Sequence, residues 1–211
     1  MRVAVVDDHE LFRDGLAELL RDRGHDVVVA VATGEEAVEA IPRAAPHVVV
    51  MDLRLPGMSG IDATRALATA APLAKVLMLT VAGDLESLRE AIRCGASGYM
   101  LKSDDADAII DAVETVAGGG AAVSPHPLKA LLDVLGGAPG QAPGVPVDAG
   151  LTPREVDTLR LLARGLANPD IAAELLVSPE TVKHHVSTIL AKTGARNRVE
   201  AVAWAVANGV V

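Results

Sequence analysis

Two hydrophobic patterns alternate along the first 120 residues of the chain. Short runs rich in β-branched residues are typical of strands, and the longer stretches between them place apolar residues at helical spacing. The strand-like runs cover residues 3–6, 27–32, 48–53, 75–80 and 97–101. The helix-like stretches cover residues 11–22, 34–44, 61–70, 85–95 and 105–119. This alternation predicts an α/β fold with a five-stranded, doubly wound parallel sheet that helices cover on both faces.

A purely helical pattern begins at residue 151. Its four stretches cover residues 151–165, 168–176, 178–194 and 197–209. Thr152 and Ser178 each stand directly before a proline, as N-cap residues often do, and Glu155 completes a capping box with Thr152. Glycines end three of the stretches. The pattern predicts a small all-α domain of four helices.

The segment between these two patterns has a different character. Residues 136–150 are rich in glycine and proline and carry few large apolar side chains, which is typical of a flexible linker. Residues 125–135 have a pattern compatible with a helix. The sequence therefore predicts a first domain over residues 1–120, a linker over residues 121–150 and a second domain over residues 151–211.

Charge separates the two parts more sharply than the net value of −9 suggests. Residues 1–150 contain 12 Lys and Arg against 22 Asp and Glu, whereas residues 151–211 contain 7 against 6. Only the C-terminal part can approach a polyanion without strong repulsion. The single cysteine excludes an internal disulfide, no apolar run approaches a membrane span, and the acidic N-terminus is unlike a secretory signal. We therefore expect a soluble, cytoplasmic protein with no membrane segment.

Polar side chains stand where the predicted strands end. The first strand ends in Asp7 and Asp8, the third in Asp52 and the fourth in Thr80, and the fifth leads into Lys102. These ends share one edge of a parallel sheet, where functional groups collect. Carboxylates held this close repel each other, and a divalent cation with hard oxygen ligands, most simply Mg²⁺, relieves the repulsion. We expect Asp7 and Asp8 to clamp the metal, which leaves Asp52 as the nucleophile toward a phosphoryl group that Lys102 and Thr80 stabilise.

Four pieces of the sequence resemble the receiver domain of bacterial response regulators, which has a flavodoxin-like fold. They are VVDDHELFRDGL, MDLRLPGMSG, the LT that ends at Thr80 and the GYMLK that ends at Lys102. The resemblance covers about residues 1–120, and it implies that Asp52 accepts a phosphoryl group from a histidine kinase. It also implies a conformational change relayed through Thr80 and Tyr99. The implied ligands of Mg²⁺ or Mn²⁺ are Asp7, Asp8, Asp52 and the backbone carbonyl of Arg54.

The third helical stretch of the second domain has two opposite faces. Its apolar stripe, which a core would bury, contains Val182, Val186, Ile189 and Leu190. The opposite, polar stripe carries Lys183, His184, Ser187 and Ala191. With the preceding stretch and a brief turn it forms a helix-turn-helix layout, in which the second helix contacts base edges in the major groove.

Residues 151–211 resemble the DNA-binding domain of LuxR-type regulators, and the whole chain resembles the NarL/FixJ class of response regulators. The resemblance is carried by LTPRE, the ARG at 163–165, the NPDIA at 168–172, the TVKHH at 181–185 and Lys192. It implies that Lys183, His184 and Ser187 face the bases of double-stranded DNA, with Thr181 and Lys192 nearer the phosphates. The last helix has two interpretations. Val202 and Val206 belong to the domain core, or they pair two domains in a homodimer.

These features predict a two-component response regulator that binds promoter DNA as a dimer once Asp52 is phosphorylated, and not an enzyme that acts on an external substrate. One alternative is an orphan regulator whose receiver serves only for dimerisation, although a disused pocket need not retain all five polar residues. The other alternative is a phosphatase of the haloacid dehalogenase type. Such enzymes have a DxDx[TV] pattern at the first strand, whereas here the acids are adjacent and the expected nucleophile is on the third strand.

Overall fold

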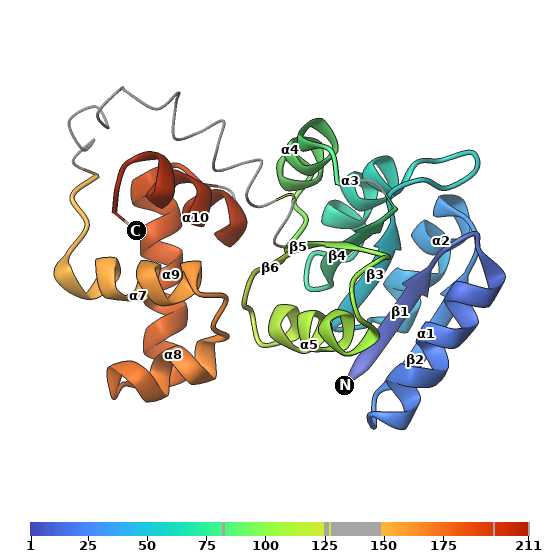
Figure 1. The fold of residues 1–211 in the computed structure, drawn as a ribbon, viewed down its shortest axis with the longest axis horizontal. Coiled ribbons are helices and arrows are strands. Elements are labelled where there is room, and N and C mark those ends of the chain that lie inside the picture. Colours follow the sequence, from blue (N-terminus) through green and yellow to red (C-terminus); the bar gives the residue numbers. More distant parts are fainter. Residues whose placement is uncertain (82, 125–126, 128–148, 196, 211) are drawn as a thin grey trace.

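The computed structural model describes residues 1–81, 83–124, 127, 149–195 and 197–210. The helix expected within residues 125–135, apart from residue 127, and most of the linker expected at residues 136–150 lie outside this part of the chain. Figure 1 shows an α/β part built from the N-terminal half and an all-helical part built from the C-terminal residues. The fold class predicted from the hydrophobic pattern is therefore confirmed for both parts.

A parallel sheet forms the centre of the first part. Its strands are β1 (Arg2–Val6), β2 (Asp26–Val31), β3 (Val48–Asp52), β4 (Lys75–Thr80), β5 (Gly98–Leu101) and β6 (Ala122–Val123). They follow the order β2-β1-β3-β4-β5-β6, and every neighbouring pair is parallel. The five predicted strands are present, and their predicted bounds are off by at most one residue at either end.

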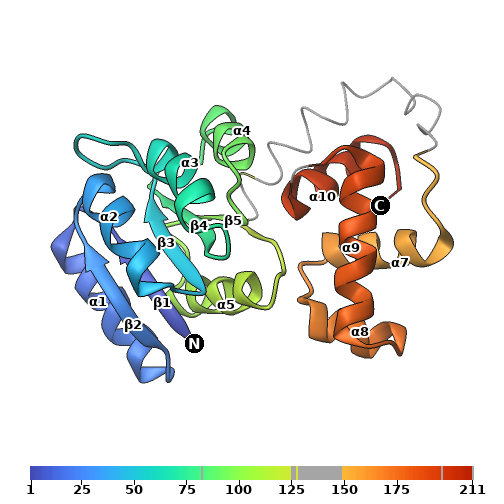
Figure 2. The ribbon, with the colours of Figure 1, turned by 180° about the vertical axis from the view of Figure 1, so that it is seen from behind.

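Helices cover both faces of this sheet, as Figures 1 and 2 show. They are α1 (Glu10–Asp22), α2 (Gly34–Ala44), α3 (Gly60–Ala70), α4 (Leu85–Arg93) and α5 (Ala106–Ala117). Successive side chains of a strand point to opposite faces, so a single strand supplies both cores. Val3 and Val5 of β1 pack with α1 and α5, whereas Ala4 and Val6 pack with α2, α3 and α4. This arrangement explains the continuous apolar runs in the sequence.

Strand β6 was not expected from the sequence. Its two residues pair with Gly98 and Tyr99 of β5, so the sheet continues past residue 120, where we expected the first domain to end. Ser124, directly after β6, is hydrogen-bonded to β5 as well. Its backbone N–H donates to the Tyr99 carbonyl at 2.9 Å, and its hydroxyl accepts from the Leu101 N–H at 2.8 Å. A two-residue strand that follows three glycines has too short a pattern to be predicted.

The second part consists of α7 (Pro153–Ala163), α8 (Asn168–Leu175), α9 (Pro179–Thr193) and α10 (Arg198–Ala207). The predicted capping box of α7 is confirmed, since Thr152 accepts from the Glu155 N–H and the Glu155 carboxylate accepts from the Thr152 N–H. The predicted N-cap of α9 is confirmed too, since Ser178 accepts from the Thr181 N–H. Among the described helices, none has the length and apolar character needed to cross a membrane.

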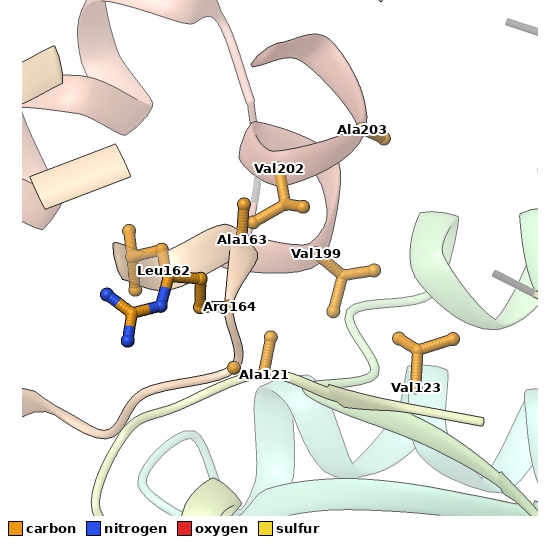
Figure 3. A pocket seen from close by; sticks show the side chains of 9 residues that line it. Ala121, Val123, Leu162, Ala163, Arg164, Val199, Val202 and Ala203 are labelled. Atoms are coloured by element: carbon orange, nitrogen blue, oxygen red, sulfur yellow. The ribbon is translucent and has the colours of Figure 1, made fainter. Parts of the chain in front are cut away.

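The two parts are in contact through α10 and the segment before it. Val199 is 4% exposed and belongs to the same apolar cluster as the α2–α4 face of the sheet. Across a pocket of about 160 Å³ it faces Ala121 and Val123 of the β6 segment, as Figure 3 shows. Asn197, directly before α10, donates through Nδ2 to the Ile92 carbonyl of α4 at 2.9 Å. The last helix is therefore docked on the receiver-like part through both apolar and polar contacts.

Candidate functional site

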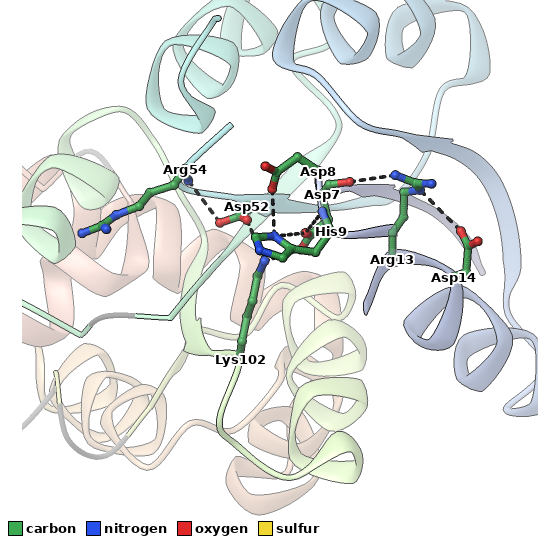
Figure 4. Close-up of polar contacts among 8 residues, drawn as sticks. All are labelled: Asp7, Asp8, His9, Arg13, Asp14, Asp52, Arg54 and Lys102. Atoms are coloured by element: carbon green, nitrogen blue, oxygen red, sulfur yellow. Dashed lines mark hydrogen bonds and ion pairs between the residues drawn. The ribbon is translucent and has the colours of Figure 1, made fainter. Parts of the chain in front are cut away.

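An acidic cluster lies where β1 and β3 end, at the carboxyl edge of the sheet (Figure 4). Asp7 and Asp52 are 1% and 4% exposed, whereas Asp8 lies at the surface. Ligand atoms of these three acids and of His9 all lie within 4.8 Å of one another. The structure thus brings together the three carboxylates that the sequence placed at neighbouring strand ends, because β1 pairs directly with β3.

Lys102 reaches into this cluster from the loop that follows β5. Its Nζ lies 2.6 Å from Asp52 Oδ2 and 2.7 Å from Asp7 Oδ2. The contact with Asp52 is a hydrogen bond, whereas the buried Asp7 Oδ2 accepts no hydrogen bond of normal geometry from the described residues. One ammonium group therefore faces two buried carboxylates, and the centre keeps a net negative charge.

The environment shifts the proton affinities of both partners. Burial raises the pKa of the Asp52 carboxyl, and the hydrogen bonds from Lys102 and from the Arg54 backbone N–H at 3.1 Å offset this only in part. Burial by itself lowers the pKa of Lys102, but the hydrogen bond to Asp52 and the negative charges of Asp52 and Asp7 outweigh it and raise the pKa overall. The ammonium therefore stays charged, and further positive charge would stabilise the Asp52 carboxylate.

A divalent cation fits this cluster. The buried Asp7 Oδ2, which has an ion pair with Lys102 but no hydrogen bond among the described residues, and the excess negative charge are both features that a hard cation relieves. The cluster also contains His9, which we did not predict. Its Nδ1 lies 2.9 Å from Asp8 Oδ1 and 3.5 Å from Asp7 Oδ1. The available signal was its place directly after the two acids, because the residue that follows a strand end stays close to that edge.

The loop after Asp52 folds back closely over the site. Gly60 N donates to the Leu53 carbonyl at 3.1 Å, and a Cβ atom on Gly60 would stand only 1.9 Å from the Asp52 carbonyl oxygen. Any side chain would collide with this backbone. The glycine that ends the MDLRLPGMSG piece is thus explained by the close approach of α3 to the end of β3.

Thr80 and Tyr99 lie on the neighbouring strands β4 and β5, and each is 1% exposed. Burial, together with the charge of Asp84, raises the pKa of Tyr99 to about 12 despite its hydrogen bonds with Ser87 and Thr80. The Thr80 carbonyl accepts a hydrogen bond from the Lys102 N–H at 2.7 Å. Tyr99 therefore connects Thr80 to Ser87 of α4, and the backbone of Thr80 is joined to that of Lys102.

The polar face of α9 is open to solvent. Its exposed side chains include the three that were expected to face bases, Lys183, His184 and Ser187. Thr181 is half-buried at the start of the helix, with its hydroxyl 2.8 Å from that of Ser178. Lys183 forms an ion pair with Glu180 at 3.1 Å on the same face. The opposite stripe lies in the domain core, where Val182 and Ile189 are 0% exposed.

Lys192 has an internal partner that sequence reasoning missed. Its Nζ lies 2.7 Å from Oε2 of Glu155, a residue that is 5% exposed, and it also donates to the Gly150 carbonyl at 2.9 Å. Burial raises the pKa of Glu155, but the hydrogen bonds from Lys192 and Thr152 outweigh burial and lower the pKa overall. The ion pair joins α9 to the start of α7, and a contact of Lys192 with DNA phosphate stays a prediction.

The two candidate dimerisation residues of α10 are both half-buried. Val202 packs at the margin of the helical core and also lines the pocket that faces the β6 segment. A core position is thus observed for Val202, whereas a role in pairing two chains stays a prediction for Val202 and Val206.

Two protein families match the chain in the order that the fold suggests. Residues 3–114 match the family described as "Response regulator receiver domain", and residues 149–205 match the one described as "Bacterial regulatory proteins, luxR family". This chain belongs to the response regulators. It combines a receiver with a LuxR-type DNA-binding domain, it regulates transcription, and it is not an enzyme acting on an external substrate.

Individual relatives agree with this over the full length. The transcriptional regulatory protein LnrK of Bacillus subtilis (strain 168) is 37% identical over 218 residues, covering 100% of this chain and 98% of the relative. The DNA-binding transcriptional activator DevR/DosR of Mycobacterium tuberculosis is 37% identical over 206 residues, covering 97% and 94%. A crystal structure of the response regulator ChrA in a heme-sensing two-component system is 35% identical, with a TM-score of 0.53 and coverage of 100% and 98%.

Proposed function

We propose that Asp52 is the phosphoacceptor of this response regulator. Asp52 Oδ would form a bond to phosphorus while the phosphorus–nitrogen bond of a phosphohistidine on a sensor kinase breaks, and the histidine nitrogen keeps the electron pair. The observation that carries this assignment is the pairing of buried Asp52 with Lys102 at 2.6 Å, beside a second buried carboxylate, Asp7, that faces the same ammonium at 2.7 Å.

The other residues of the site have separate tasks in this scheme. Asp7, Asp8 and Asp52, with the Arg54 carbonyl, would hold Mg²⁺ or Mn²⁺, which supplies positive charge for the phosphoryl oxygens. Lys102 would exchange its hydrogen bond from Asp52 to a phosphoryl oxygen, and Thr80 would donate its hydroxyl to another. Because Thr80 contacts Tyr99, its reorientation would be felt at α4.

For the second domain, we assign DNA recognition to the exposed face of α9. Lys183, His184 and Ser187 would contact base edges in the major groove, and Thr181 would contact a phosphate. Two chains, paired through the exposed side of α10 near Val202 and Val206, would bind two half-sites of promoter DNA together. A protein that meets both a sensor kinase and chromosomal DNA would act in the cytoplasm.

The test is phosphorylation by a small phosphodonor such as acetyl phosphate with Mg²⁺. Wild-type protein should gain one phosphoryl group by intact mass, and its affinity for operator DNA should increase at least tenfold. Asp52→Asn should gain none and should bind DNA equally with and without the donor. Asp111→Asn makes the same chemical change at an exposed aspartate of α5, away from the acidic cluster, and should behave like wild type. Equal DNA affinity of the wild type in both conditions would favour the orphan-regulator alternative.

A further inference from the structure

A second charged site lies between the two domains, away from the acidic cluster. It is a pocket of about 530 Å³, a size within the range of about 300–1,000 Å³ that takes small molecules. The receiver contributes Lys75 and the glycines after α5, and the DNA-binding domain contributes Asn168, Lys183 and Arg198. The lining contains three cations and no carboxylate among the described residues.

The nitrogen donors of this pocket converge on one place. The position of a Cβ atom on Gly119 would be 3.1 Å from Arg198 Nη2, 3.4 Å from Asn168 Nδ2 and 3.4 Å from Lys75 Nζ. Gly119 has a φ of +84°, which favours glycine and leaves this position free of a side chain. Nitrogen atoms at such distances from one point can each donate to a different oxygen of a single oxyanion, through N–H···O⁻ bonds of about 2.8 Å.

The hydrogen bonds within the protein do not explain why these cations gather in the pocket. Lys75 donates to the Ala117 carbonyl at 2.8 Å, so a structural role at the end of α5 accounts for Lys75 alone. It does not account for Arg198, whose terminal nitrogens, among the described residues, hydrogen-bond to Asn168 Oδ1 alone, each at 3.4 Å. In the part of the chain that the structure describes, neither Lys75 nor Arg198 has a carboxylate partner, whereas Lys183 pairs with Glu180 at 3.1 Å.

The proximity of these cations is electrostatically unfavourable. Burial lowers the pKa of Arg198 to about 10, and burial with the charges of Arg198 and Lys183 lowers the pKa of Lys75. Cations that are partly desolvated and close together need a counter-charge. An anion bound between the domains would supply it and would connect the receiver to the DNA-binding domain.

We propose that this interdomain pocket binds a phosphate-class oxyanion, held by Lys75 from the receiver and by Arg198 and Asn168 from the DNA-binding domain. The oxyanion is inorganic phosphate or the terminal phosphate of a nucleotide. Its binding favours the docked arrangement of the two domains, because its ligands come from both of them. If α9 contacts DNA as proposed above, the same anion weakens DNA binding, since Lys183 lines the pocket.

The experiment is a calorimetric titration of the full chain with inorganic phosphate and, separately, with ADP. EDTA is present so that the acidic cluster holds no metal, and sodium chloride keeps the ionic strength constant. Lys75→Gln and Arg198→Gln should each weaken binding at least tenfold. Arg43→Gln removes an exposed cation of α2 and should bind like wild type. Tighter binding of ADP would identify a nucleotide as the ligand, and equal affinities would identify the free oxyanion.

The proposal is overturned if wild type binds neither ligand above the chloride background, or if Lys75→Gln binds as tightly as wild type. Melting curves of each variant establish that a loss of binding is not a loss of folding. The calorimetric result does not depend on DNA, so a failure of the DNA-recognition proposal would leave it unchanged. Phosphate-dependent weakening of operator binding by wild type, but not by Lys75→Gln, would then support the consequence for DNA.

Discussion

At the scale of single residues, Leu176 in the turn between α8 and α9 is under backbone strain. It ends α8 in the left-handed region with a φ of +54°, and its side chain is 91% exposed. A branched side chain in this region costs about 1–2 kcal/mol relative to glycine, and an exposed leucine has little packing to lose. The strain lies inside the helix-turn-helix unit itself.

Leu176→Gly should therefore stabilise the DNA-binding domain by about 1 kcal/mol, the part of the strain that remains after the greater chain entropy of glycine is subtracted. Urea unfolding followed by the fluorescence of Trp204, the single tryptophan of the chain, measures this domain specifically. Leu73→Gly is the control in the receiver, because Leu73 is also 90% exposed but has no positive φ. Its unfolding is followed by circular dichroism, since Trp204 reports on the other domain, and glycine there should give no gain in stability. A lower stability of the Leu176 variant would contradict the strain argument.

The residues of the acidic cluster show how far the sequence could lead. Asp7, Asp52 and Lys102 were predicted to meet because each lies at or directly after the end of a strand, and strand ends of one parallel sheet share an edge. The pairing of Lys192 with Glu155 was not predicted, because 37 residues separate them and no periodic pattern relates them. Contacts fixed by sheet order follow from a sequence, whereas contacts between helices depend on packing angles that a sequence does not state.

At the scale of elements, the start of α7 is fastened to α9 by that same ion pair. Glu155→Gln should destabilise the DNA-binding domain by about 2 kcal/mol, because glutamine keeps the capping box but loses the charge that faces Lys192. The lowered pKa of Glu155 means that its contribution is present above about pH 4.3, the ordinary value for glutamate, and is lost as pH falls through the lowered value.

Trp204 fluorescence during urea unfolding at pH 7 and at successively lower pH tests this expectation. The difference between wild type and Glu155→Gln should be largest at pH 7 and should shrink below about pH 4.3. Glu174→Gln is the control, because it removes an exposed ion pair with Arg164 whose charged atoms are 3.9 Å apart. It should lower the free energy of unfolding by less than about 1 kcal/mol. A pH-independent difference would show that the charge of Glu155 is not what matters.

The elements differ in how well the sequence predicts them. The strands β1 to β5 and the caps of α7 and α9 were predicted because each has a local cause, an apolar run or a cap followed by proline. Strand β6 was missed, because its two residues form a strand only through backbone pairing with β5, which no local pattern indicates. For the same reason the docking of α10 on α4 and β6 has no counterpart in the local pattern.

At the scale of the whole molecule, Asn197 joins the domains and caps α10 at once. Its Oδ1 accepts from the Glu200 N–H at 3.0 Å, while its Nδ2 donates to the Ile92 carbonyl of the receiver. Asn197→Asp keeps the cap but replaces the donor with a carboxylate oxygen that repels the carbonyl. Loss of the donor weakens docking by about 1–3 kcal/mol, equivalent to a shift of about 5-fold to 150-fold toward separated domains.

Small-angle scattering of the unphosphorylated protein should therefore give a larger radius of gyration for Asn197→Asp than for wild type. Operator binding without phosphodonor should strengthen by about tenfold, because the pocket beside Lys183 opens. Asn208→Asp makes the same chemical change at the other end of α10, where the amide donates within its own helix, and should leave the radius unchanged. An unaltered radius for Asn197→Asp would mean that this hydrogen bond does not hold the domains together.

The contact of the α10 N-terminus with α4 also has a thermodynamic consequence in the opposite direction. If phosphorylation frees the DNA-binding domain by changing the α4 surface, then DNA that captures the freed domain must favour the phosphorylated state of the receiver by the same factor. Such reciprocity applies to equilibria and not to rates. The promoter would thus act as an effector of its own regulator, and copies bound to DNA would hold their phosphoryl group at lower donor concentrations than copies free in solution.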